Sequence, residues 1–113
     1  MTAATSDGDA LYCVVQTTLP DASAARVLAR HIVEAHLGAC VQMTPVSSVY
    51  RWQGVVQEDA EVLLSIKTRR VLWPALQAFI GERHPYDTPE LVCLPLLDGA
   101  APYLRWIDAG TQA

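Results

Sequence analysis

The chain has 113 residues, of which 51% are hydrophobic and 18% are charged, and its formal net charge is −4. This composition is typical of a single globular domain and not of a disordered chain. The acidic balance argues against nucleic acid as a partner, because no basic surface is available to neutralise phosphates. Each apolar run is shorter than the roughly 20 residues that a membrane-spanning helix needs, so we expect no membrane partner.

The first ten residues are small and polar, without the basic start and apolar core of a secretory signal. We therefore expect a disordered tail over residues 1–10 and one domain over residues 11–109. Three cysteines, Cys13, Cys40 and Cys93, lie in apolar stretches and lack the C-x-x-C spacing of a zinc site. We expect buried, reduced thiols, which favours a cytoplasmic protein.

Residues 11–18 are β-rich and almost continuously apolar, which predicts a strand covered on its faces. A helix is expected from Asp21 onward, with Gly38 ending it as a C-terminal cap. His31 and His36 are five residues apart, so they do not share the i, i+4 face of helical metal pairs. The apolar stripe of this helix, at helical spacing, is Ala25, Leu28, Ala29, Ile32 and Val33.

Residues 40–53 are predicted to form a long strand. Pro45 within it indicates a bulge or an edge position, because proline donates no hydrogen bond to a sheet. Gly54 supplies a turn, and residues 55–68 return as a second long strand whose last part alternates apolar and polar residues. A helix is predicted over residues 70–83, with Pro74 in its first turn.

A last strand is predicted over residues 91–97, where Pro95 indicates an edge or a strand end. Pro102 then opens a short terminal helix. The order β-α-β-β-α-β is that of ferredoxin-like α+β domains. Right-handed crossovers place both main helices on one face of a four-stranded antiparallel sheet.

The predicted hairpin around Gly54 is unusually long, because strands ordinarily run about five to six residues. Its tip carries the apolar side chains of Tyr50, Trp52, Val55 and Val56. An isolated ribbon of this composition exposes apolar surface and unpaired strand edges. We therefore expect a closed, symmetric homo-oligomer in which hairpins pair with neighbouring sheets. The alternative is a hairpin shortened by a loop within one chain.

The segment 84–90 combines an imidazole, a phenol, a hydroxyl and two carboxylates with two prolines. Each proline restricts its own φ angle and the conformation of the residue before it, so this segment is a stiff connector. Rigid polar connectors are frequent positions for binding residues. The alternative is that His84 is a helix C-terminal cation and that Asp87 only forms a turn.

Six motifs, taken together, resemble the CutA family of divalent-cation tolerance proteins. The resemblance runs from Leu11 to about Trp106. The motifs, in chain order, are Leu37-x-Ala39-Cys40-Val41, Tyr50-Arg51-Trp52-x-Gly54, Glu58-Asp59-x-Glu61-Val62, Ile66-Lys67-Thr68, His84-Pro85-Tyr86-x-x-Pro89-Glu90 and Tyr103-Leu104-x-Trp106.

This resemblance implies a ferredoxin-like fold, a homotrimer joined by intersubunit β-pairing, an architecture similar to the trimeric PII signalling proteins, and loose association with copper and other divalent cations. It implies no agreed enzymatic reaction. The family's copper-ligand positions correspond here to Thr17, Arg83 and His84. Only His84 can donate a lone pair to a metal, because Thr17 offers no thiolate and Arg83 stays protonated.

The remaining polar motif residues favour a cleft between subunits that accepts a small anion, a metabolite or a metal complex. Two alternatives belong to other classes: an enzyme that uses His84 and Glu90 as acid and base, and a trimer that docks to other proteins. We expect no enzyme, because the chain has no nucleophile elbow, phosphate loop or metal triad. The residues expected to line the cleft are Trp52, Lys67, His84, Tyr86, Glu90 and Trp106.

Overall fold

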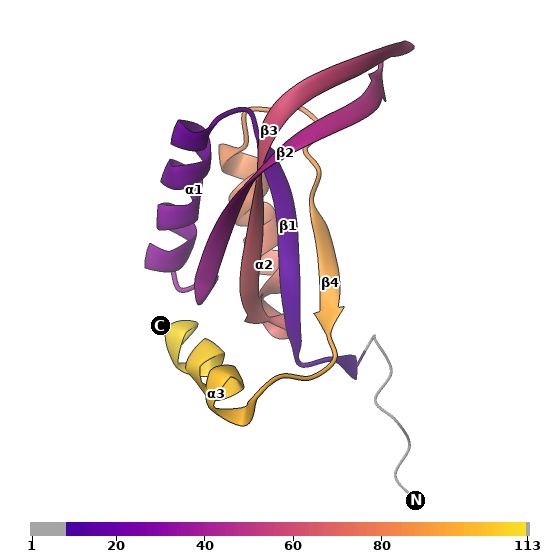
Figure 1. Ribbon diagram of the computed structural model, residues 1–113. Helices are drawn as coiled ribbons and strands as arrows, with labels where there is room; N and C mark the ends of the chain where they lie inside the picture. The colour runs from indigo at the N-terminus through magenta and orange to yellow at the C-terminus, as the bar shows by residue number, and fades with distance from the viewer. Residues whose placement is uncertain (1–8, 113) are drawn as a thin grey trace, which may run out of the picture.

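A computed structural model describes residues 9–112 and shows a mixed α/β fold (Figure 1). The predicted tail at residues 1–10 lies mostly outside this part of the chain, although Ala10 is buried. No helix among the described residues is long and apolar enough to cross a membrane. The elements are β1 (Tyr12–Leu19), α1 (Ala22–Glu34), β2 (Cys40–Trp52), β3 (Val55–Arg69), the 3-10 turn η2 (Arg70–Leu72), α2 (Trp73–Arg83), β4 (Val92–Leu96) and α3 (Ala101–Gly110).

The four strands form one antiparallel sheet in the order β2-β3-β1-β4. Both prolines within strands therefore lie in edge strands, as expected for residues that cannot donate to a neighbour. Pro45 is paired with Val62 in a register that continues unbroken on both sides. Of the two possibilities for Pro45, the edge position is confirmed and the bulge does not form.

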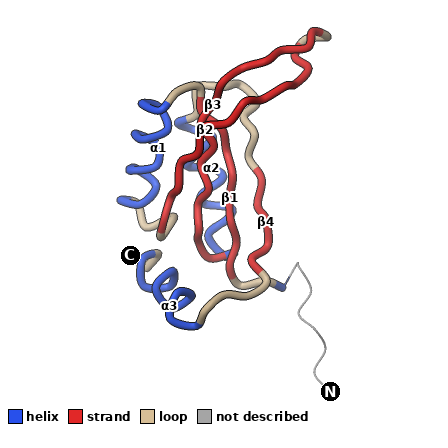
Figure 2. The backbone as a smooth tube through the Cα atoms, in the orientation of Figure 1, coloured by secondary structure: helices blue, strands red, loops and turns tan. Residues whose placement is uncertain are grey.

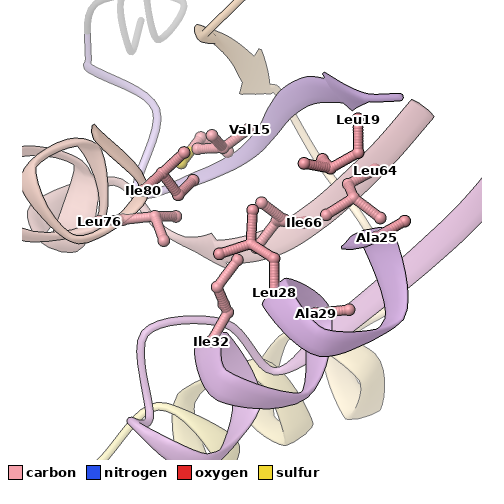
Figure 3. Close-up of a cluster of buried hydrophobic side chains, with 11 residues drawn as sticks. Val15, Leu19, Ala25, Leu28, Ala29, Ile32, Leu64, Ile66, Leu76 and Ile80 are labelled. Atoms are coloured by element: carbon pink, nitrogen blue, oxygen red, sulfur yellow. The ribbon is translucent and has the colours of Figure 1, made fainter. Parts of the chain in front are cut away.

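The core lies between one face of the sheet and helices α1 and α2 (Figure 3). Alternate residues of β1 and β3 point into it, which follows from the two-residue period of a strand. Val33, predicted as part of the stripe of α1, is instead 42% exposed. The fully or nearly fully buried members of this cluster are Cys13, Val15, Leu19, Ala25, Leu28, Ala29, Ile32, Leu64, Ile66, Leu76 and Ile80.

Gly38 does not end helix α1, which corrects the sequence prediction. The helix ends at Glu34, and the residue with left-handed backbone conformation after it is His36, at φ 59°. A Cβ atom on Gly38 would lie 2.7 Å from Cγ2 of Ile66 and 2.9 Å from Cγ2 of Ile32. Glycine is needed at this position because the chain passes directly against the core, and not because of its φ angle.

The hairpin extends well beyond the rest of the molecule (Figure 2). Strand β1 accompanies β3 only as far as the Leu19–Val62 pair, and from Glu61 outward β3 pairs with β2 alone. Gln53 and Gly54, at φ 51° and 80°, close the resulting two-stranded ribbon. The alternative of a hairpin shortened by a loop is therefore wrong. The exposed apolar side chains of the ribbon are Val49, Tyr50, Trp52, Val55 and Val56.

Helix α3 packs against the end of the sheet that lies opposite the hairpin tip (Figure 1). The Tyr12 hydroxyl donates to the carboxylate of Asp108, whose two oxygens lie 2.9 and 3.0 Å away. The guanidinium of Arg69 donates to the hydroxyl and to the carbonyl oxygen of Thr111, at 2.8 and 2.9 Å. These bonds attach the terminal helix to the two central strands.

The three cysteines are free thiols. Cys13 is buried, and Cys40 and Cys93 are half-buried. Burial, together with the neighbouring Cys93, raises the pKa of the Cys13 thiol to about 12. This thiol is protonated at neutral pH and is therefore a poor nucleophile.

Candidate functional site

The connector 84–90 is attached to β1 through the imidazole of His84. Helix α2 ends at Arg83, and His84 adopts an extended backbone conformation, as the following proline requires. Its Nε2 lies 2.9 Å from the carbonyl oxygen of Thr18 and 3.1 Å from the hydroxyl of Thr17. Its Nδ1 accepts a hydrogen bond from the backbone N–H of Tyr86 at 3.1 Å. The ring therefore fixes both the start of the connector and its position on the sheet.

This hydrogen-bond pattern requires a neutral imidazole with its proton on Nε2, because Nδ1 is an acceptor and the Thr18 carbonyl can only accept. Burial lowers the pKa of His84 from its ordinary value, and the bond to Thr18 and the charge of Glu61 offset part of that effect. Protonation of Nδ1 would remove the acceptor that holds the Tyr86 N–H. The structure thus gives His84 a positioning role within the connector.

A pocket of about 840 Å³ lies between the hairpin ribbon and the connector. Such a volume is typical of sites for small molecules. Strands β2 and β3 supply one side of the pocket, the connector supplies another, and the end of β1 completes it. Its lining residues are Thr18, Pro20, Ser48, Val49, Tyr50, Trp52, Asp59, Ala60, Glu61, Tyr86, Asp87, Thr88 and Glu90.

Two tyrosine–carboxylate pairs organise the wall of the pocket. The Tyr86 hydroxyl donates to Oε2 of Glu61 at 3.0 Å, and the Tyr50 hydroxyl donates to Oδ2 of Asp59. Burial, followed by the bond to Glu61, raises the pKa of Tyr86 to about 12. The bond to Asp59 is the main cause of a raised pKa at Tyr50. Both phenols therefore remain hydrogen-bond donors throughout the physiological pH range.

The structure brings together only three of the six residues expected to line the cleft. Trp52, Tyr86 and Glu90 line the pocket. His84 is the anchor of the connector and is not among the lining residues. The remaining two lie elsewhere: Lys67 donates a hydrogen bond to Gln42, and Trp106 stacks on Tyr103 with a ring separation of 5.6 Å. Lys67 makes no ion pair with Glu61 or Glu90.

Lys67 and Trp52 lie at opposite ends of the hairpin. Lys67 is paired with Cys40 at the inner end of the ladder, and Trp52 is paired with Val55 at its tip. A strand advances about 3.3 Å per residue, so the two positions are roughly 40 Å apart along β2. One copy of the chain therefore cannot bring both side chains to one cleft.

The residues at the family's copper positions do not fit a metal ion. The Thr17 side chain is buried against His84, and the Arg83 guanidinium lies 3.6 Å from the centroid of the Phe79 ring. A metal at His84 would have to displace the Tyr86 N–H from Nδ1 or the Thr18 carbonyl from Nε2. Over residues 9–112, no three His, Cys, Asp or Glu side chains are grouped so that they could hold a metal ion.

Sequence reasoning did not assign Tyr50, Asp59 or Glu61 to the site. The signal was present, because Asp59 and Glu61 are two residues apart and share a strand face. Counting backward from the turn at Gln53–Gly54 places Ser48 opposite Asp59. Tyr50, two residues along on the same face, is then a diagonal neighbour of Asp59 within reach of its carboxylate.

Comparisons with known proteins agree with this fold. The family described as CutA1 divalent ion tolerance protein matches residues 13–110. The crystal structure of CutA1 from Oryza sativa is similar to this chain with a TM-score of 0.88 and 42% identity, covering 91% of this chain and 95% of that one. The Pyrococcus horikoshii CutA1 structure gives a TM-score of 0.87 at 34% identity, covering 89% and 99%.

Two named relatives show the same agreement in sequence. The divalent-cation tolerance protein CutA of Thermus thermophilus is 43% identical over 99 residues, which is 87% of this chain and 96% of that protein. Protein CutA of Mus musculus is 42% identical over 97 residues, or 85% of this chain. The chain spans about half the length of the mammalian relatives that it matches. From the family match and these identities together, the chain belongs to the CutA1 divalent ion tolerance family.

Proposed function

We propose that the chain is a homotrimeric divalent-cation tolerance protein that acts through the small-ligand pocket, and not through a tightly bound metal ion of its own. One observation carries the proposal: the family match covers residues 13–110, yet the positions expected to bind copper lack a ligand set. The pocket between the ribbon and the connector is then the feature available for a specific ligand. The proposal groups the chain with PII-like ligand-binding trimers and not with metal carriers.

The exposed strand edges and the exposed apolar ribbon support the trimer. Strands β2 and β4 both have one unpaired edge, and β4 exposes Val92 and Leu94 by 43% and 42%. A two-stranded ribbon is marginally stable in water by itself. Closed three-fold pairing of ribbons with neighbouring sheets covers these edges and the tip together. The proposal includes a ferredoxin-like subunit, whose β-α-β-β-α-β order matches that of the chain.

The trimer also explains how the predicted cleft residues meet. Because Lys67 and Trp52 are at opposite ends of one hairpin, a shared cleft requires them from different copies. Trp106 lies on α3, at the Lys67 end of the sheet. In this arrangement one subunit supplies Trp52, Tyr86 and Glu90, and its neighbour supplies Lys67 and Trp106.

Sedimentation equilibrium tests the assembly. We expect a mass of three chains, each of 12.3 kDa, at micromolar concentration. Val56→Asp, at an exposed apolar position of the ribbon, should produce single chains, whereas Glu58→Gln on the same strand should leave the trimer intact. A single-chain mass for the unaltered protein with normal helix and sheet content would contradict the proposal.

Titration with copper or zinc tests the second part. We expect no stoichiometric binding of either ion at micromolar protein concentration, because a firm site needs three or four ligands. A complementation experiment uses cells that lack their own family member. Restoration of copper tolerance by the unaltered chain, but not by its pocket variant Trp52→Ala, would support action through the pocket. Tight metal binding that disappears in His84→Ala would contradict it.

We place this activity in the cytoplasm. Support comes from the three free cysteines, since reduced thiols persist in a reducing compartment. Relatives are named for other compartments: one from Arabidopsis thaliana is called chloroplastic, and a structure from Archaeoglobus fulgidus is described as periplasmic. Thiol titration of protein isolated without reductant is expected to find three reduced cysteines after denaturation.

A further inference from the structure

One face of strand β3 carries opposite charges at its two ends. Leu64 and Ile66 are buried against helices α1 and α2, so the residues that alternate with them point to the face that these two helices leave uncovered. On that face, Asp59 and Glu61 lie in the ribbon, and Lys67 lies at the inner end of the hairpin. Glu61 and Lys67 are six positions apart, roughly 20 Å along the strand. Their side chains therefore cannot meet within one copy of the chain.

The carboxylate of Glu61 has no cationic partner within residues 9–112. Both ion pairs in this range lie on helices, one on α1 and one at the end of α2. Glu61 accepts the Tyr86 hydroxyl, and a carboxylate offers about four lone-pair directions, so acceptor capacity remains. Among the acids that line the pocket, Glu61 is half-buried, whereas Asp59, Asp87 and Glu90 are exposed. Further burial therefore affects Glu61 most, because a carboxylate that loses its water needs a partner.

Lys67, the only lysine of the chain, has the complementary deficit. It is half-buried between Val14 and Cys40, its direct neighbours on the two adjacent strands. Its ammonium donates to the side-chain oxygen of Gln42 and forms no ion pair with a carboxylate of the described chain. An ammonium has three N–H donors, so two remain for a partner outside the chain.

A second copy of the chain fits both deficits. Placed head to tail against the uncovered face, it brings its own Lys67 to Glu61 of the first copy. Such a contact is heterologous, because each copy presents its acidic end to one neighbour and its basic end to the other, and it can close into a ring. Assembly removes water from both groups, and a charge buried without a partner is costly. Charge complementarity therefore selects this alignment of the copies.

We propose that Lys67 of each copy forms an ion pair with Glu61 of the next, so that the neighbouring copy completes the pocket between the ribbon and the connector. This inference rests on the proposed trimer and names a contact that joins its subunits at the pocket. No lysine, arginine or histidine of the described chain lines the pocket, whereas four carboxylates do. The assembled site differs from this, because one carboxylate is paired and a neighbour's ammonium forms part of the wall.

A double-mutant cycle on the full chain tests the pair. Its members are Lys67→Met, which keeps an unbranched stem, Glu61→Gln, which keeps the side-chain shape, and the two together. Sedimentation over a dilution series gives the dissociation constant of the assembly, at a fixed urea concentration at which the unaltered protein dissociates measurably. Each single substitution should raise that constant about tenfold or more, because it leaves the other charge buried and unpaired. The double variant should raise it by clearly less than the product of the two single effects.

Glu58→Gln, on the opposite face of β3, is the matched control, and its effect should multiply with that of Lys67→Met. Equal coupling of Lys67→Met to Glu58→Gln and to Glu61→Gln would overturn the ion pair and leave the trimer standing. Stronger coupling to Asp59→Asn than to Glu61→Gln would overturn the choice of Glu61. A single-chain mass for the unaltered protein, with normal helix and sheet content, would overturn both the trimer and the pair. Circular dichroism checks folding, and Lys67→Gln replaces Lys67→Met in the cycle if that variant does not fold.

Discussion

The hydroxyl of Tyr86 donates a hydrogen bond to Oε2 of Glu61 across 3.0 Å and so joins the connector to the hairpin strand β3. On its other side, the backbone N–H of Tyr86 binds Nδ1 of His84, which is itself bonded to β1. One residue thus links the two walls of the pocket to the central sheet. The conformation of the connector is therefore coupled to the conformation of the ribbon at its base.

Tyr86→Phe should lower the free energy of unfolding by about 1 kcal/mol, because it removes one side-chain hydrogen bond and keeps the ring. The measurement is denaturant unfolding of the full chain at fixed concentration. Tyr103→Phe is the matched control, since Tyr103 contributes a ring stack with Trp106 and its hydroxyl has no hydrogen-bond partner among the described residues. Equal losses in the two variants would contradict the role given to the Tyr86 hydroxyl.

His84 should make stability depend on pH in the acidic range. Its folded-state pKa is lowered, chiefly by burial, so the unfolded chain binds a proton more readily. The contribution of the neutral ring is complete above the unfolded-state pKa of about 6.5 and is lost as the pH falls through the lower, folded-state pKa. We expect the connector to loosen over the same range, because protonation of Nδ1 releases the Tyr86 N–H.

The difference in unfolding free energy between wild type and His84→Gln, followed as a function of pH, measures this contribution. At pH 8 the variant should be less stable by about 1–3 kcal/mol through lost buried hydrogen bonds, and the gap should narrow as the pH falls. His31→Gln, on the exposed surface of α1, is the matched control for the substitution itself. A gap that widens toward acid pH would show that the ring is stabilised as a cation.

Gly38→Ala should destabilise the protein by about 1–3 kcal/mol, the usual effect of overpacking a core. The added methyl group would approach Ile66 and Ile32 within 3.0 Å, and both side chains are fully buried and branched at Cβ. Thermal unfolding measures the loss. Gly81→Ala is the matched control on helix α2, where a Cβ meets nothing within 4 Å and should be neutral or stabilising.

Periodicity predicted most of the elements, because the alternation in β3 and most of the helical stripe of α1 follow burial, with Val33 at the end of that stripe as the exception. It could not decide the role of Gly38. Glycine is favoured both at left-handed positions and at close approaches, and here His36 adopts the left-handed conformation while Gly38 allows contact with the core. Which of the two applies depends on a packing distance that no local pattern contains.

The sequence predicted only part of the candidate site, because the missing part also depends on which residues the fold brings together. Motif membership grouped Lys67 with Trp52, but the hairpin register separates them by the length of the ribbon. The same register, counted from the turn, would have placed Asp59 beside Tyr50. The charge of the pocket was hidden because its acids come from two segments that meet only after folding. The hairpin register predicts the site residues better than motif membership does, since strand pairing fixes which side chains are neighbours.

The turn that closes the ribbon gives the last prediction. Gln53 and Gly54 both have positive φ angles, as in a type I′ turn, which favours Asn-Gly. Gln53→Asn should therefore stabilise the protein by a few tenths of a kcal/mol up to about 1 kcal/mol, because asparagine tolerates this conformation better than glutamine. Gly54→Ala should cost about 1 kcal/mol through backbone strain alone, since a Cβ there meets nothing within 4 Å. Chemical unfolding of the full chain at fixed concentration, with Gln57→Asn on β3 as a control for composition, measures both effects. Opposite signs for the two variants are required, because Gln53→Asn introduces a residue that tolerates a positive φ angle and Gly54→Ala removes one.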